Sequence, residues 1–211
     1  MDGGSDDGTL ERIKATAGDV RWVTGVRGGI ANAMNIGVEM AKGEFIAHLH
    51  GDDWYLRENV LLQVESALLH SNAEWLFGRV ADYIDGELSY PSWTMPVFSF
   101  RNILWRNFIA HPAVFMRRQL FKEAGGFDAT LKYAMDYDLW LKLSKLATPY
   151  YFPEYLAAFR RHSGSVSTAN PAATFKEDLL VRLRYAEETY IPQAFFKAVH
   201  HWRALKRVHL G

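Results

Sequence analysis

The sequence predicts an α/β fold. Two observations support this: short apolar runs of strand length alternate with segments of helical periodicity, and turns that contain glycine separate them. The chain has 211 residues and is 49% hydrophobic, which fits one domain with a packed core and a small appendage. No internal repeat or low-complexity segment is present.

The first half of the chain alternates helices and strands. Residues 30–42 carry apolar side chains at helical spacing and end before Gly43, whereas the apolar run 44–49 is too short for a helix. Asp85-Gly86 has the composition of a hairpin turn. In order, we expect a helix at 9–17, a strand at 20–23, a helix at 30–42, a strand at 44–49, a helix at 57–70 and a strand at 75–84.

The second half continues the alternation and ends in helices. Leu139, Leu143 and Leu146 share one face of a predicted helix, and Pro192 interrupts the last helical region. In order, we expect a short helix at 98–105, a strand at 112–116, a helix at 118–124, a helix at 133–146, short strands at 150–152 and 155–160, and helical structure at 171–209.

Composition excludes several classes of protein. The 24 basic and 24 acidic residues balance, which argues against nucleic acid as a partner. The absence of cysteine excludes disulfides, thiolate chemistry and Cys-based zinc sites. No run of about 18 apolar residues and no signal-peptide pattern is present. We expect a cytoplasmic protein.

Two adjacent carboxylates, Asp52 and Asp53, follow the predicted strand 44–49. Ligands bind open α/β sheets at the C-terminal ends of strands, and a divalent cation with a diphosphate needs oxygen ligands there. Alternatively, Asp53 caps the next helix and Asp52 is a turn residue. The pair alone does not decide between these interpretations.

A second acidic pair, Asp136 and Asp138, begins the predicted helix at 133–146. The simple interpretation is that carboxylates favour a helix N-terminus by about 0.3–1 kcal/mol. The functional interpretation is that one of them is a general base near a pocket. We expect the helix N-terminus to lower the pKa of such a base and keep it ionised at neutral pH.

Other clusters in the sequence give weaker evidence of a functional site. Residues 2–9 resemble a calcium loop only superficially, because Ile13 stands where an EF-hand needs Glu. Residues 159–167 suit an anionic diphosphate, although for this cluster alone we favour a surface loop. We expect His48, His111 and His200 to be packing or surface residues. The glycine fingerprints of nucleotide-binding loops, the zinc-protease motif and the nucleophile elbow are absent from the sequence.

Several motifs occur in a recognisable order. The first are Asp2-Gly3-Gly4-Ser5-x-Asp7-Gly8-Thr9, Arg27-Gly28-Gly29-Ile30-Ala31-Asn32-Ala33-Met34-Asn35 and Gly51-Asp52-Asp53-Trp54. The later ones are His111-Pro112-Ala113-Val114-Phe115, Gly125-Gly126-Phe127-Asp128, Met135-Asp136-Tyr137-Asp138-Leu139-Trp140-Leu141 and Arg160-x-His162-x-Gly164-Ser165-Val166-Ser167. Together they resemble the family 2 glycosyltransferases. The resemblance implies a GT-A fold, a mixed sheet flanked by helices, over residues 1–168, followed by a helical C-terminal extension at 169–211.

The resemblance implies a role for each matching residue in binding the donor. Asp2 resembles the residue that reads the nucleotide base, and Asp52 the one that contacts the ribose. Asp53 would hold Mn²⁺ or Mg²⁺ on the diphosphate. Arg160 and His162 would approach the diphosphate or the metal. The donor that the resemblance favours is a UDP-sugar.

The resemblance also implies a reaction. Asp136 resembles the catalytic base, although Met135 departs from the Glu or Ala that usually precedes it. One displacement with one base inverts the anomeric centre, and we find no clear candidate for the nucleophile that a retaining mechanism needs. The acceptor would be a glycan or a lipid-linked hydroxyl, in the synthesis of cell-surface polysaccharide or glycolipid.

The sequence departs from the family at its start. The family has a strand, a helix and a strand before the motif that begins here at Asp2, and they supply part of the nucleotide pocket. We therefore expect donor binding by this chain alone to be impaired. The alternatives are a noncatalytic relative that binds a nucleotide sugar and, less favoured, a nucleotidyltransferase, for which no basic triphosphate loop is visible.

The C-terminal residues 192–208 form a basic segment with aromatic side chains. It either packs back on the domain, which we favour, or lies on an anionic membrane surface at the inner face of the membrane. Salt-sensitive co-sedimentation with liposomes would distinguish the two. The oligomeric state, a homodimer included, stays open.

Overall fold

A computed structural model describes residues 1–162, 164, 170–186 and 192–208. It contains a mixed sheet with the strand order β1-β5-β3-β6-β2, and β4 pairs with β3. The pairing of β3 with β6 is parallel, and the others are antiparallel. The strands are β1 (Phe45–Ala47), β2 (Trp54–Tyr55), β3 (Trp75–Ile84), β4 (Glu87–Ser89), β5 (Val114–Arg117) and β6 (Tyr150–Arg160). The predicted α/β fold is confirmed.

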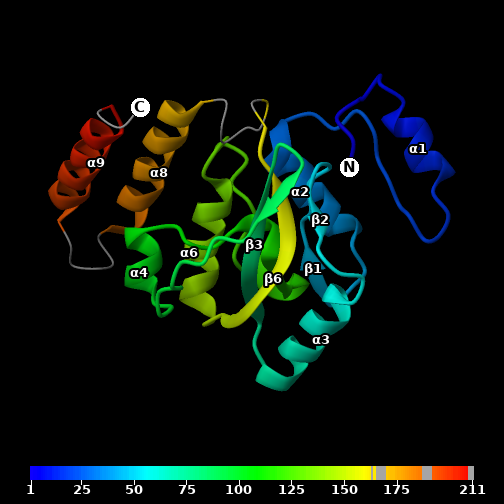
Figure 1. Cartoon of the computed structure of the whole chain (residues 1–211), viewed down its shortest axis with the longest axis horizontal. Helices are drawn as coiled ribbons and strands as arrows, with labels where there is room; N and C mark the ends of the chain where they lie inside the picture. Colours follow the sequence, from blue (N-terminus) through cyan, green and yellow to red (C-terminus); the bar gives the residue numbers. More distant parts are fainter. Residues whose placement is uncertain (163, 165–169, 187–191, 209–211) are drawn as a thin grey trace.

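Helices cover both faces of the sheet. Helix α3 packs on one face, where Val64 and Leu68 meet Leu156. Helices α2, α4, α5, α6 and α8 pack on the other face. Figure 1 shows α1 and the N-terminus at one end of the molecule and α9 at the opposite end. The helices are α1 (Thr9–Ala15), α2 (Gly29–Met40), α3 (Val60–Ser71), α4 (Phe100–Trp105), α5 (Arg118–Glu123), α6 (Met135–Leu146), α8 (Pro171–Tyr185) and α9 (Gln193–Val208), with a 3₁₀ turn at His111–Ala113.

The larger core lies between β3 and α6. Trp75 stacks on Trp140 with 6.1 Å between ring centroids, and its indole Nε1 donates a hydrogen bond to the carbonyl of Ala147. Val181 of α8 and Phe196 of α9 are buried in the same cluster. The C-terminal helices therefore share a core with the sheet, as the favoured interpretation of residues 192–208 predicted. Among the described residues, no helix has the length and apolar character needed to cross a bilayer.

The parallel pair β3 and β6 is irregular where it approaches the site. Its register shifts on both sides of Arg79, which pairs with Tyr155. A Cβ at the preceding Gly78 would lie 2.5 Å from the Leu156 side chain and 3.0 Å from the Glu154 carbonyl, so only glycine fits. Such bulges bend a strand and redirect its side chains. The predicted strands at 150–152 and 155–160 are thus one bulged strand.

The strand predicted at 20–23 is wrong. Its backbone has no ladder partner and makes one hydrogen bond to the first loop, from the Asp2 amide to the Val23 carbonyl. An apolar run without a neighbouring strand cannot form a sheet. Strand β1 pairs with β5 alone among the described strands, and a hollow of about 720 Å³ lies between β1, α2 and Met1.

Candidate active site

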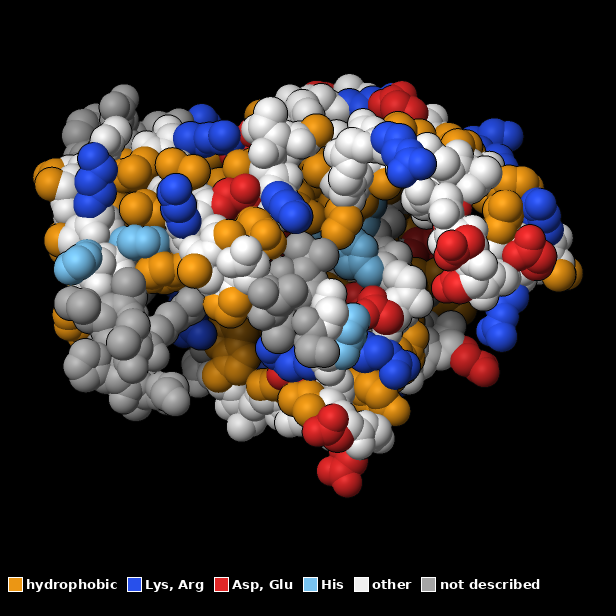
Figure 2. Space-filling model, turned by 90° about the horizontal axis from the view of Figure 1, so that it is seen from above, with side chains coloured by type: hydrophobic (Ala, Val, Ile, Leu, Met, Phe, Trp, Pro, Cys, Tyr) orange, Lys and Arg blue, Asp and Glu red, His pale blue; other side chains and the backbone are white. Residues whose placement is uncertain are grey.

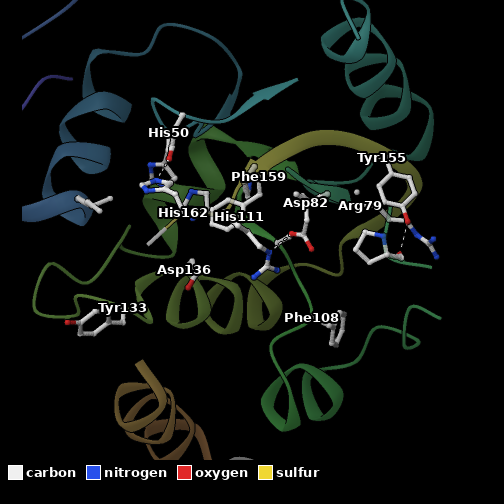
Figure 3. A pocket seen from close by; sticks show the side chains of 18 of the residues that line it. His50, Arg79, Asp82, Phe108, His111, Tyr133, Asp136, Tyr155, Phe159 and His162 are labelled. Carbon is white, nitrogen blue, oxygen red and sulfur yellow. Dashed lines mark hydrogen bonds and ion pairs between the residues drawn. The ribbon is translucent and has the colours of Figure 1, made fainter. Parts of the chain in front are cut away.

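A cavity of about 620 Å³ lies where β3, β6 and the start of α6 meet. Its volume falls within the range of sites for small ligands, about 300–1,000 Å³. In Figure 3, His50, His162 and Asp136 lie on one side of the cavity, while Arg79 and Tyr155 lie on the other, beyond Asp82. From above, histidine and acidic side chains lie side by side near the middle of the molecule (Figure 2). The cavity thus brings together titratable groups from separate parts of the chain.

Asp52 and His162 meet at one end of this cavity. The Asp52 Oδ2 and His162 Nε2 atoms are 2.8 Å apart, and both side chains line the cavity. Asp52 stands in the turn between β1 and β2, and His162 follows the end of β6. The structure therefore joins two residues that the sequence separates by 110 positions.

Asp53 is turned away from the cavity. Its side chain is only 8% exposed, and its Oδ1 accepts a hydrogen bond from the backbone amide of Arg160 at 3.1 Å. Its Oδ2 is buried and, among the described residues, has no hydrogen-bond partner. Burial raises the pKa of this carboxyl. In this structure Asp53 ties the turn after β1 to the end of β6.

Arg160 is not among the residues that line the cavity, and its approach to the diphosphate or the metal stays a prediction. Its guanidinium lies over the rings of Trp54 and Tyr83, 5.5 and 4.8 Å from their centroids. Arg161, the next residue, lines the cavity and donates through Nε to Asp82 at 2.7 Å. The Arg160 side chain thus faces the two aromatic rings, and the Arg161 side chain faces the cavity.

Asp136 lines the cavity and is half-buried. Its Oδ1 accepts a hydrogen bond from the Tyr137 amide at 2.6 Å. Burial, together with the nearby negative charge of Asp178, raises the pKa of this carboxyl to about 7. The expected lowering of its pKa is therefore wrong, because desolvation outweighs the helix N-terminus.

The N-terminus of α6 is occupied by another carboxylate, Glu177 of α8. Its oxygens accept hydrogen bonds from the amide of Ala134 at 2.7 Å, from that of Lys132 at 3.0 Å and from that of Tyr133. These are the amide groups that precede the helix and favour a negative charge. Glu177 was missed because nothing in the sequence of a distant helix marks one of its glutamates as a cap.

Asp138 points into the core. Its side chain is 1% exposed, and its Oδ1 accepts a hydrogen bond from the Tyr185 hydroxyl at 2.9 Å. Lys142 Nζ lies 2.7 Å from Oδ2 as an ion pair, although the angles are not those of a hydrogen bond. Arg184 lies 3.4 Å from Oδ1. Asp138 thus links α6 to α8, and of the two acidic residues only Asp136 lines the cavity.

Asp2 is not among the residues that line this cavity. Its carboxylate accepts hydrogen bonds from the hydroxyl groups of Ser5 and Thr24 and from the amide of Gly4. These bonds, that of Ser5 first, lower its pKa strongly. Asp2 fastens the first loop to residues 23–26. Its predicted contact with a nucleotide base stays a prediction.

The histidines near the site divide into two groups. His48 and His111 are enclosed by aromatic side chains, with the ring of His111 stacked on that of Phe127. Burial lowers the pKa of His48 to about 4 and that of His111 well below its usual value. The expectation that these two are packing residues is confirmed. His111 nevertheless lines the cavity, as does His50, whose ring centroid lies 5.2 Å from that of His111.

Much of the cavity wall has no local motif in the sequence. Arg79 and Asp82 are charged residues within β3, and Trp93 stands in an irregular segment. Arg161 follows the end of β6 and belongs to the predicted cluster at 159–167, but only the structure shows that it lines the cavity. Residues 163 and 165–167 of the predicted cluster at 159–167 lie outside the described residues.

The donor atoms at the Asp52 end fit a divalent cation that shares its ligands with a phosphate. Within the described ranges, no three His, Cys, Asp or Glu side chains form a complete metal site. Mg²⁺ is usually bound by one or two carboxylates together with substrate phosphates, and imidazole and carboxylate both bind Mn²⁺. One carboxylate and one imidazole at the cavity wall match such a shared site.

Comparison with known proteins identifies relatives. The sequence profile described as Glycosyl transferase family 2 matches residues 1–125. An uncharacterized glycosyltransferase of Rickettsia conorii is 30% identical over 80% of this chain and 30% of its own length. Chondroitin synthase of Pasteurella multocida is 33% identical over 68% of this chain and 15% of its own. The chain thus spans less than a third of the length of these relatives.

Solved structures confirm the fold. S. aureus TarS in complex with UDP-GlcNAc superimposes with a TM-score of 0.68 at 18% identity, over 91% of this chain and 58% of that one. This likeness supports the GT-A arrangement of a mixed sheet flanked by helices. Since the family profile covers more than half of the chain, the protein belongs to glycosyl transferase family 2.

Proposed function

We propose that this chain carries the site of an inverting glycosyltransferase, which moves a sugar from a nucleotide-diphosphate sugar to an acceptor hydroxyl. One observation carries the proposal: Asp136 and the Asp52–His162 pair line the same cavity. The complex of TarS with UDP-GlcNAc supports a UDP-sugar as the donor. The kinship with chondroitin synthase supports a role in polysaccharide synthesis.

In this mechanism Asp136 is the general base. It removes the proton of the acceptor hydroxyl while that oxygen attacks the anomeric carbon, and the bond to the nucleoside diphosphate breaks on the opposite face. A base works best when its pKa lies near the working pH, and burial raises the pKa of Asp136 to about 7. A single displacement inverts the anomeric centre. The other cavity carboxylates support this choice, because Asp52 and Asp82 are paired with His162 and Arg161.

We assign the metal to Asp52 and His162, and this revises the sequence-based expectation for Asp53. Asp52 faces the cavity, whereas Asp53 is buried against the end of β6. A bound Mn²⁺ or Mg²⁺ would supply positive charge to the leaving diphosphate. The acceptor is a glycan or a lipid-linked hydroxyl. Trp202 of α9 is exposed and would belong to the surface for a peripheral membrane contact.

A thermal-shift titration with Mn²⁺ and UDP tests the donor end, with GDP and dTDP as alternative nucleotides. We expect metal-dependent stabilisation by UDP that Asp52→Asn abolishes. Asp53→Asn is the matched control, because an amide oxygen can still accept the Arg160 amide hydrogen bond. Loss in Asp53→Asn alone would return the metal to Asp53. No stabilisation of the parent chain by any of the three nucleotides would contradict both the proposed transferase and the noncatalytic relative that binds a nucleotide sugar.

A further inference from the structure

The cavity has a second end beyond Asp82, which the proposed donor site does not use. We call it the distal end and define it by Arg79, Trp93, Phe108 and Tyr155. Figure 3 shows Arg79 and Tyr155 on the far side of Asp82 from His162. A donor held at the Asp52–His162 end would therefore leave the distal end open to another molecule, in the same cavity that Asp136 lines.

Arg79 brings a positive charge to this end without a carboxylate partner. Its Nε donates a hydrogen bond to the Tyr151 hydroxyl at 2.8 Å, and its Nη2 donates to the Trp93 carbonyl at 3.3 Å. Within the described part of the chain, no acidic side chain lies within 4 Å of its guanidinium, whereas Arg161 of the same cavity is paired with Asp82. A half-buried guanidinium gains most from a ligand that supplies the missing carboxylate.

Aromatic rings surround this charge. Trp93 is 41% exposed and lines the cavity, and Arg106 lies over its ring. The Tyr155 hydroxyl donates to the Pro91 carbonyl at 2.6 Å, and Arg79 lies over the Tyr155 ring. The C–H face of a sugar ring packs well on such partly exposed aromatic groups. An anchored aromatic wall beside a cation suits a carbohydrate that carries a negative charge.

The backbone fixes this arrangement. The register shifts beside Arg79 set it opposite Tyr155, and Gly78 leaves no room for a side chain between the strands. Both hydrogen bonds of the Arg79 side chain go to neutral groups, so they hold its direction without neutralising it. The guanidinium has five N–H donors, which leaves several for a ligand.

We propose that the distal end is an acceptor subsite for a sugar that carries a carboxylate, which Arg79 recognises. The proposal rests on the proposed function, because it takes the hydroxyl presented to Asp136 from the sugar held here. Arg79 would act as a specificity residue: it contacts the acid group, and Trp93 and Tyr155 hold the ring. A neutral acceptor would lose the ion pair while keeping the aromatic contact.

Direct binding tests this proposal without requiring turnover. We would titrate the chain with a tetrasaccharide of alternating glucuronate and N-acetylglucosamine, and with its carboxyl-reduced, neutral counterpart, by calorimetry. We expect the acidic form to bind about tenfold more tightly. Arg79→Gln should remove that preference. Arg101→Gln, at an exposed arginine of α4 outside the cavity, should leave it intact.

Further variants separate recognition from folding. Trp93→Leu should weaken both oligosaccharides while the preference for the acidic one persists. Circular dichroism and the Mn²⁺–UDP thermal shift of each variant show whether the fold and the donor end are intact. Equal affinity for the two oligosaccharides, no binding of either, or a preference that survives Arg79→Gln would overturn the subsite. Acid-selective binding without any response to nucleotides would keep the subsite and reject the proposed transfer.

Discussion

The two acidic pairs of this chain lie in different regions and divide in the same way. After β1, Asp52 faces the cavity while Asp53 is bound to the backbone of β6. At the start of α6, Asp136 faces the cavity while Asp138 is enclosed with Lys142. In each pair one carboxylate is available to a ligand, and the other joins two elements of the fold.

The physical difference within a pair is what surrounds each carboxylate. Asp138 has cationic neighbours that compensate its burial. Asp136 has no such compensation: burial and the charge of Asp178 both raise its pKa. A carboxylate that the fold fails to stabilise as an anion is suited to take up a proton, which is what a general base does. Neighbouring carboxylates can thus serve different purposes, one in the chemistry and the other in the stability of the fold. Substitutions at Asp136 and Asp138 should distinguish these two purposes.

The largest effect should come from removing the base. We expect Asp136→Asn to lower the rate of sugar transfer by about 10²–10⁴-fold, the usual contribution of a positioned general base. Its Mn²⁺–UDP thermal shift should remain, because the side chain does not belong to the Asp52–His162 pair. Radiolabelled transfer to the best acceptor measures the loss, with the exposed Asp19→Asn as the matched control. Transfer at the parental rate by Asp136→Asn would exclude this residue as the base.

A second substitution should act on the fold rather than on the chemistry. Asp138→Asn keeps an oxygen for the Tyr185 hydroxyl but leaves Lys142 without its ion pair. We expect the free energy of unfolding to fall by about 2 kcal/mol, below the usual cost of breaking a buried pair because Lys142 is partly exposed. Urea denaturation measures it, with the exposed Asp6→Asn as the control. An unchanged midpoint would show that the pair contributes nothing to stability.

Which carboxylate of each pair faces the cavity depends on the tertiary structure, and the sequence alone does not show it. Periodicity located β3, α2 and α6 to within a few residues, because their apolar faces are regular. Periodicity also predicted a strand at 20–23, but no strand among the described residues pairs with this segment. The choice between Asp52 and Asp53, or between Arg160 and Arg161, depends on which way a side chain points. That direction is set by the pairing of distant strands.

At the distal end, even less of the site could be predicted from the sequence. Arg79 owes its position to bulges in the pairing of β3 with β6, and Glu177 caps a helix that begins more than 40 residues earlier in the chain. Neither feature has a local motif. The order of the motifs predicted the family and several residues of the donor end. The residues of the distal end could be identified only from the tertiary structure.

The smallest expected effect is on the pH dependence of stability. It tests the contrast between the two carboxylates of a pair through Asp136 alone. Its pKa rises from 3.8 to about 7 on folding, so the folded protein binds this proton more tightly than the unfolded chain. The free energy of unfolding should therefore fall as the pH rises from about 4 to 7. Asp136→Asn removes this dependence and should be more stable than the parent above pH 7, by about 1–3 kcal/mol because partial exposure to the cavity reduces the effect.

Two buried histidines act in the opposite direction over part of the same range. The pKa values of His48 and His111 are lowered on folding, so their contribution to stability increases as the pH rises toward 6.5. The difference between Asp136→Asn and the parent cancels the histidines and isolates the carboxyl. Urea denaturation between pH 4 and 8 gives this difference at each pH. A difference that grows between pH 4 and 7 and is then constant supports the raised pKa, whereas a flat difference would mean that Asp136 is ionised throughout and that burial does not prepare it as a base.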